Sequence, residues 1–391
     1  MQRRKEHGMN QKELREIRRR IRPEHNSITH LYGCYVNGAK EIISTLEESL
    51  GLLTQEEQEK YLALLKKTLS GALGKNLLNI SFATKQVLDS EEHRLLSALR
   101  KSEGKDAALR EQFYRTVMEK LDMDGENCLI LLAFDTYDVP HYGKDDSMDD
   151  AGEVYKYMLC AVCPVKGGKA ELGYAPEEKR FHSATAGQVV SAPELGFLFP
   201  AFDDRAANLY SALFYTRDSK ADHADFIDAV FRTEVPMPAG RQREHFEGLL
   251  SDTLEQDCRF DVLQSVHEQL SERITLHKES KDPEPLTLSP EEMGDILENS
   301  GATSQERERF VRRCEETFGA EAELLPGNLS NPKRMEIQTP EVKIQVSPEH
   351  SELVQARILE GRKVIVIDAS NGVELNGVPV RIAEGAALVT E

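Results

Sequence analysis

The sequence predicts an α+β protein with N-terminal helices and a hairpin, a central mixed sheet with helices, and a C-terminal helical pair plus a small β module. Three patterns lead to this prediction. Apolar residues recur at helical spacing in the first third of the chain and again after residue 222, short apolar runs fill the middle, and apolar and polar residues alternate after residue 340. At 391 residues the chain exceeds the usual size of one hydrophobic core. The expected regions are 1–125, 126–277 and 286–391, with a proline-rich, charged linker ahead of the last.

The N-terminal region opens with a predicted amphipathic helix. Asn10 can cap its first turn, and Glu13 stands three residues further on, as in a capping box. Pro23 then ends the helix. The apolar positions of its buried face are Leu14, Ile17 and Ile21.

Turn and cap signals place the next elements. Asn37-Gly38 separates two strand-like segments, 27–36 and 41–46, which predicts a hairpin. Thr54 with Glu57 predicts the start of a second helix. Further helices are expected over 90–102, 106–121, 222–231, 241–254 and 260–274.

Short, nearly continuous apolar runs predict strands that are buried on both faces. These runs cover residues 77–82, 128–134, 155–165 and 208–215. In the C-terminal region, Ser289-Pro290 predicts a helix start, a second helix fits 304–318, and the alternation over 342–346 with the turn at Asn376-Gly377 predicts a small β module.

Composition argues against membrane and export functions. No apolar run approaches the roughly 20 residues that span a bilayer, and the N-terminus lacks the apolar stretch of an export signal. We therefore expect a cytoplasmic protein with reduced thiols. Cys160 and Cys163 have metal-ligand spacing, but no second pair accompanies them, so we expect neither a metal nor a cofactor.

The charge of −19 is unevenly distributed. Residues 1–22 contain nine Lys or Arg and three Glu, a net charge of +6, which leaves −25 for the rest of the chain. A basic N-terminal helix on an acidic body favours contact with a polyanion such as DNA, with a partner protein, or with a second copy of the chain. Pairing with the acidic body itself is an equal alternative. The candidate binding residues are Lys12, Arg15, Arg19 and Arg22.

Carboxylates that follow buried strands are a second candidate site. Asp135 and His141 follow the run 128–134, and Asp203 and Asp204 follow another apolar stretch. If the two groups converge, they could hold a divalent metal or act as acid and base. A helix cap with an internal ion pair is the simpler interpretation of the second group.

Four segments carry a family resemblance. They are RRRIRPEHNSITHLYGCYVN at 18–37, KYLALLKKTLSG at 60–71, YDVP at 137–140 and APELGFLFPAFDDR at 192–205. The chain resembles an uncharacterised family of Gram-positive bacterial proteins, a domain of unknown function that covers nearly its whole length. Members begin near Met9, so we expect residues 1–8 to be an upstream start. The resemblance implies no site residues.

The second half, from residue 128 onward, is loosely similar in its order of elements to a bacterial nucleoid-associated protein family. That likeness implies DNA as a partner and no particular binding residue. Our main hypothesis is a non-enzymatic binding protein associated with the nucleoid. The alternatives are a metal-dependent hydrolase or phosphoryl-transfer enzyme that uses Asp135, Asp203 and Asp204, and a structural protein that self-associates as a homo-oligomer.

Overall fold

The computed structural model describes residues 8–381 apart from 122, 124, 143–147, 150–153, 169, 176, 178, 186, 234, 235, 256, 257, 332 and 333. Its helices and strands confirm the α+β class. The chain divides into two units, unit 1 with Met1–Gln242 and Pro283–Pro285, and unit 2 with Arg243–Asp282 and Leu286–Glu391. The three ranges expected from sequence divide it differently, because strands of the first range join the sheet of the second.

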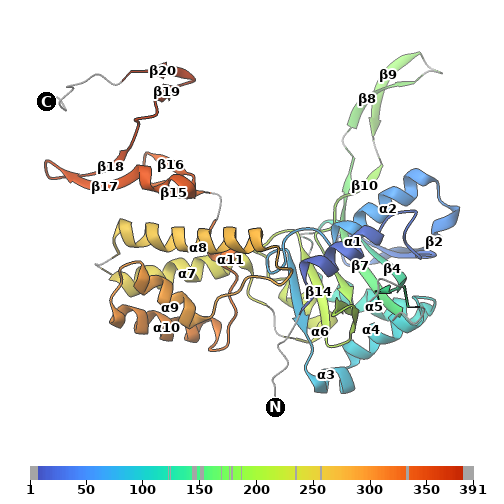
Figure 1. Cartoon of the computed structure of the whole chain (residues 1–391). Helices are drawn as coiled ribbons and strands as arrows, with labels where there is room; N and C mark the ends of the chain where they lie inside the picture. The colour runs from blue at the N-terminus through green and yellow to red at the C-terminus, as the bar shows by residue number, and fades with distance from the viewer. Residues whose placement is uncertain are drawn as a thin grey trace. The chain divides into compact units, whose positions relative to one another are not determined.

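Unit 1 is built on one eight-stranded sheet (Figure 1). Its order is β2-β1-β4-β7-β11-β14-β3, and β10 also pairs with β7. Neighbouring strands of this sheet run antiparallel in each of its described pairs. Strand direction could not be predicted, because apolar runs indicate burial and carry no information on direction. The strands are β1 (His30–Val36), β2 (Ile42–Ser49), β3 (Leu77–Ser81), β4 (Asn127–Asp138), β7 (Val154–Gly167), β10 (Gln188–Val190), β11 (Leu195–Phe199) and β14 (Ser211–Thr216).

Each face of this sheet carries its own hydrophobic core. Along β7, Cys160 packs into one core and Cys163 into the other, as the alternation of a strand requires. This placement makes the two cysteines packing residues on opposite faces.

Helices cover both faces of the sheet (Figure 1). α1 (Gln11–Arg20) and α2 (Gln55–Lys67) supply apolar side chains to one core. α4 (Glu91–Lys101), α5 (Ala107–Lys120) and α6 (Ala224–Phe231) supply the other. Unit 1 also contains the short helix α3 (Thr84–Asp89), the 3₁₀ turn Leu50–Leu52, and the hairpins β5 (His141–Tyr142) with β6 (Met148–Asp149), β8 (Ala170–Ala175) with β9 (Arg180–Thr185), and β12 (Ala201–Asp203) with β13 (Ala206–Asn208).

Unit 2 has a helical core of its own. α7 (Ala239–Leu254), α8 (Phe260–Ser280), α9 (Pro290–Asn299) and α10 (Ser304–Phe318) bury apolar side chains together, with the short α11 (Pro326–Leu329) beside them. The expected helix start at Ser289 is confirmed, with a capping box between Ser289 and Glu292 and with Pro290 in the first turn.

Three two-stranded hairpins follow these helices. They are β15 (Met335–Gln338) with β16 (Lys343–Val346), β17 (Val354–Leu359) with β18 (Arg362–Ile367), and β19 (Val373–Leu375) with β20 (Val378–Val380). A 3₁₀ segment, Pro348–Leu353, leads into β17. Within it Ser351 donates a hydrogen bond to Glu268 of α8 at 2.6 Å and accepts one at its carbonyl from Gln264, which ties the segment to the helices.

The buried cysteines give a simple test of the cores. Cys258 is exposed, whereas burial raises the pKa of Cys34 and Cys163 to about 12 and that of Cys128 and Cys314 to about 11. We expect one thiol to react promptly with an aromatic disulfide reagent at pH 8 in the native chain, and all six to react after unfolding in guanidinium chloride. Prompt reaction of several thiols in the native chain would contradict the packing described above.

Candidate anion-binding site on helix α1

A capping box sets the start of α1, and apolar packing against the sheet sets which of its faces is buried. The side chain of Asn10 accepts hydrogen bonds from the backbone nitrogens of Lys12 and Glu13, and the Glu13 carboxylate accepts one from the backbone nitrogen of Asn10 at 2.9 Å. The expected capping box is therefore confirmed. Leu14, Ile17 and Ile21 are buried against the sheet, so the opposite side of the helix faces solvent.

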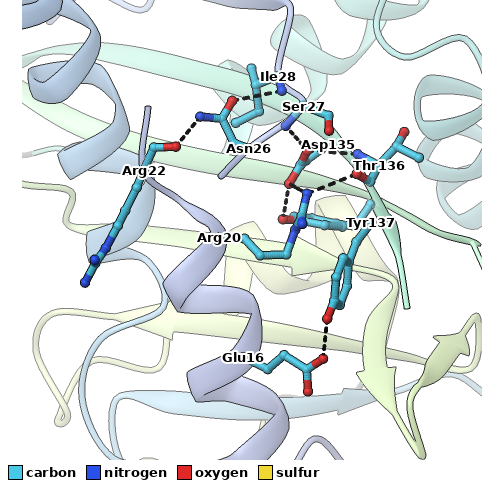
Figure 2. A network of polar contacts seen from close by, with 10 residues as sticks. Glu16, Arg20, Arg22, Asn26, Ser27, Ile28, Asp135, Thr136 and Tyr137 are labelled. Atoms are coloured by element: carbon cyan, nitrogen blue, oxygen red, sulfur yellow. Dashed lines mark hydrogen bonds and ion pairs between the residues drawn. The ribbon is translucent and has the colours of Figure 1, made fainter. Parts of the chain in front are cut away.

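A buried ion pair anchors the C-terminal end of α1 to strand β4 (Figure 2). Arg20 donates from Nη2 to Asp135 Oδ2 at 3.3 Å and to the carbonyl of Thr136 at 3.1 Å. Its guanidinium also lies over the ring of Tyr137, 4.3 Å from the centroid. The Asp135 side chain is 1% exposed, and it also accepts hydrogen bonds from Tyr157 Oη at 2.6 Å and from the backbone nitrogens of Ser27 and Thr136 at 2.7 and 2.9 Å.

A second contact joins α1 to the β12–β13 hairpin. Glu16 accepts hydrogen bonds from Tyr137 Oη at 2.5 Å and from Arg205 Nη1 at 2.8 Å. Burial, and then the hydrogen bond to Glu16, raise the pKa of Tyr137 to about 12. Glu13 accepts a hydrogen bond from the backbone nitrogen of Arg205, and burial raises the pKa of this carboxyl. Contacts of Glu13 therefore hold the first turn of α1, and contacts of Arg20 hold its last turn.

Beside this anchored helix lies a pocket of about 580 Å³. Its lining carries five Lys or Arg side chains, one histidine and a single carboxylate, that of Glu16. Two of the cations, Arg20 and Arg205, are engaged by Asp135 and Glu16. The lining residues are Lys12, Arg15, Glu16, Arg19, Arg20, His25, Tyr137, Pro140 and Arg205.

The four predicted binding residues are all exposed. Lys12, Arg15 and Arg19 line the pocket, whereas Arg22 does not. In Figure 2 the side chain of Arg22 points away from the network around Asp135. Within the part of the chain that the structure describes, none of the four forms an ion pair with a carboxylate. The alternative in which the acidic body neutralises these cations finds no support among the described residues.

A further cation belongs to the same surface. Burial, and then the charges of Arg22 and Arg18, lower the pKa of Lys66 in α2. Lys66 was not predicted, because it occurs in an ordinary stretch of helix and only the fold brings it near Arg18 and Arg22.

The arginines of α10 show the contrasting arrangement. Arg307 pairs with Glu291 and Asp295 at 2.7 Å, and Arg309 pairs with Glu255 at 2.8 Å. Carboxylates of unit 2 thus neutralise these cations, which leaves them little capacity to attract an anion.

The carboxylates proposed for catalysis occupy structural positions. Asp135 is surrounded by the donors described above, Asp203 accepts a hydrogen bond from Asn208 at 2.9 Å, and Asp204 has a left-handed backbone in the β12–β13 turn, with φ of 49°. The side chain of His141 lies outside the described residues. Among the residues that are described, no group of three or more His, Cys, Asp or Glu side chains is suited to hold a metal ion.

None of the described helices is both long enough and apolar enough to cross a membrane. The chain is an α+β protein whose N-terminal unit presents a cluster of exposed cations on a firmly anchored helix. It belongs to the family described as Domain of unknown function (DUF4317), which matches residues 9–378. No curated protein matches the chain.

Proposed function

We propose that this chain is a non-enzymatic binding protein that associates with the bacterial nucleoid and contacts DNA through Lys12, Arg15, Arg19 and Arg22. One observation carries the proposal. These four side chains are exposed and have no carboxylate partner among the described residues, whereas the arginines that hold the fold together are paired.

Clustered like charges repel one another, and an anion removes that repulsion. Duplex DNA offers such anions at high density, about one for every 1.7 Å of helix axis. The remaining net charge of −25 repels the same polymer, so attraction is confined to the α1 surface. The layout likeness of the second half to nucleoid-associated proteins favours DNA over a protein partner.

The proposal predicts salt-sensitive binding of duplex DNA. If each of the four cations contacts one phosphate, the slope of log K against log salt is about −3.6, and affinity falls about 100-fold between 50 and 200 mM salt. Fluorescence anisotropy with a labelled duplex measures both quantities. We expect the variant K12E/R15E/R19E/R22E to lose this binding.

A matched variant separates local contact from net charge. K60E/K105E/R115E/K166E changes the net charge equally, at exposed cations of unit 1 that pair with Glu56, Glu103, Glu111 and Glu126. We expect this control to retain binding. Equal loss in both variants, or binding by the native chain that is absent or insensitive to salt, would overturn the proposal. Light scattering on the free proteins tests the rival role in self-association, since a change of mass in the α1 variant alone would assign the surface to a second copy.

A further inference from the structure

Strand β18 has an apolar outer edge to which no described strand is paired. In the part of the chain that the structure describes, β18 pairs with β17 alone. Val364–Ile367 is a continuous apolar run, which is typical of a strand inside a covered sheet, yet Ile367 is 52% exposed and the other three residues are only half-buried. Natural sheets often protect such edges with a proline or a bulge. β18 contains no proline and its register with β17 is unbroken, so this edge is open to a further strand.

The backbone of β18 alternates between its partner strand and the open edge. The amide of Asp368, one residue past the strand, donates to the carbonyl of Leu353 at 2.8 Å, so residue 368 faces the β17 side. In an antiparallel ladder every second residue faces the other way. The amide and carbonyl groups of Lys363, Ile365 and Ile367 therefore point to the open edge, where another strand can bond to them.

We infer that this edge is a self-association surface, at which β18 of one chain pairs antiparallel with β18 of a second copy. Symmetry between identical antiparallel strands requires one residue to lie opposite its own counterpart. With Ile365 in that position, Val364 lies opposite Val366, and Arg362 lies opposite Asp368 at both ends of the ladder. A register centred on Val364 or on Val366 instead sets Arg362 or Asp368 against a valine, so charge and apolar matching together select Ile365.

The charged residues are free to make this pairing. Arg362 and Asp368 are exposed, and neither forms an ion pair with another described residue. Asp368 accepts two hydrogen bonds from Ser370, both at Oδ1, which leaves Oδ2 for the second copy. Lys363 lies opposite Ile367 in this register and can cover it with its alkyl stem. The product is a four-stranded sheet, which is more stable in water than two separate hairpins. The inference is independent of the proposed function, because none of these residues belongs to the α1 surface.

Ile365→Pro tests the pairing of the two backbones. Proline removes the central amide of the proposed ladder, and because that amide faces away from β17, the hairpin keeps its own hydrogen bonds. We expect analytical ultracentrifugation to show a dimer for the native chain and a dissociation constant raised by at least about tenfold in the variant. Ala356→Pro is the matched control, since Ala356 lies opposite Ile365 on β17 and its amide faces the other edge of the hairpin. This control should keep the native affinity.

An exchange of charges tests the register. In R362E two acidic side chains face each other at each end of the ladder, and in D368K two basic ones do, so each variant alone should dimerise at least about tenfold more weakly than the native chain. In an equimolar mixture, the new acidic side chain of one variant faces the new basic side chain of the other, and the remaining Arg362 faces the remaining Asp368. The mixture should therefore regain the native affinity.

The outcomes decide the inference in either direction. A native chain that stays monomeric at every concentration overturns it and leaves the edge to a strand of different sequence. Equal losses in Ile365→Pro and Ala356→Pro also overturn it, because the edge of β18 then has no special role. So does a mixture of R362E and D368K that remains dissociated. The variant K12E/R15E/R19E/R22E leaves β18 intact and should remain dimeric.

Discussion

Replacement of Asp135 by alanine is expected to lower the free energy of unfolding by about 3 to 5 kcal/mol. The substitution leaves Arg20 as a largely buried cation without its carboxylate. It also removes the acceptor of the buried Tyr157 hydroxyl, which is then left without that hydrogen bond in a dry environment, and the acceptor of the Ser27 backbone nitrogen. The loss is large because Tyr157 remains buried and Arg20 largely buried after the carboxylate is gone.

Urea unfolding followed by circular dichroism measures this change. Asp138→Ala is the matched control, since Asp138 is an exposed carboxylate of the same strand, and its removal should change stability by less than about 0.5 kcal/mol. Asp135→Asn keeps the size and part of the acceptor capacity, so an intermediate loss is expected. If Asp135→Ala proves as stable as its control, Asp135 is not the anchor of α1, and a role in binding or catalysis would be open again.

Local chemistry explains which elements could be predicted from sequence. The capping residues Asn10 and Thr54 satisfy nearby backbone groups, and Pro23 stops a helix through its own ring. Such signals act over three or four residues, so the starts of α1, α2 and α9 and the β1–β2 turn were accessible. Strand direction and partnership depend on residues far apart in the chain. β3, at the edge of the sheet, pairs with β14 across more than a hundred residues, and no local pattern encodes that pairing.

In the candidate site too, features that depend on local sequence were predicted, whereas contacts between distant segments were not. Helical periodicity predicted the stripe of Lys12, Arg15, Arg19 and Arg22. The structure places the first three of these residues in the lining of the pocket and leaves Arg22 outside it. In the sequence Asp135 follows an apolar run, which suggested a carboxylate at a strand end, whereas in the structure it lies within β4 and its partners Arg20, Ser27 and Tyr157 come from other segments. Only the assembled fold distinguishes a carboxylate that binds a ligand from one that its own chain has already satisfied.

Replacement of Gly104 is expected to cause the second large loss of stability. It lies just after α4 with φ of +70°, and its amide donates to the carbonyl of Leu99 at 3.0 Å. A Cβ atom at this position would lie 2.3 Å from Cε2 of Phe134 and 2.8 Å from Cε2 of Tyr32. The rings cannot withdraw freely, because Tyr32 is buried against the sheet and the guanidinium of Arg110 lies over its ring, 4.3 Å from the centroid.

We therefore expect Gly104→Ala to destabilise the protein by about 3 kcal/mol or more, since a left-handed backbone costs about 1 to 2 kcal/mol for alanine and crowding of a packed core adds about 1 to 3 kcal/mol. Gly125→Ala isolates the first contribution, because Gly125 has φ of +75° and no atom of the described residues lies within 4 Å of the place that an added methyl group would take. Urea unfolding of the two variants should show a clearly larger loss for Gly104→Ala. Equal losses would mean that only the backbone conformation requires glycine at 104. The rings of Tyr32 on β1 and Phe134 on β4 would then move enough to accommodate an added methyl group.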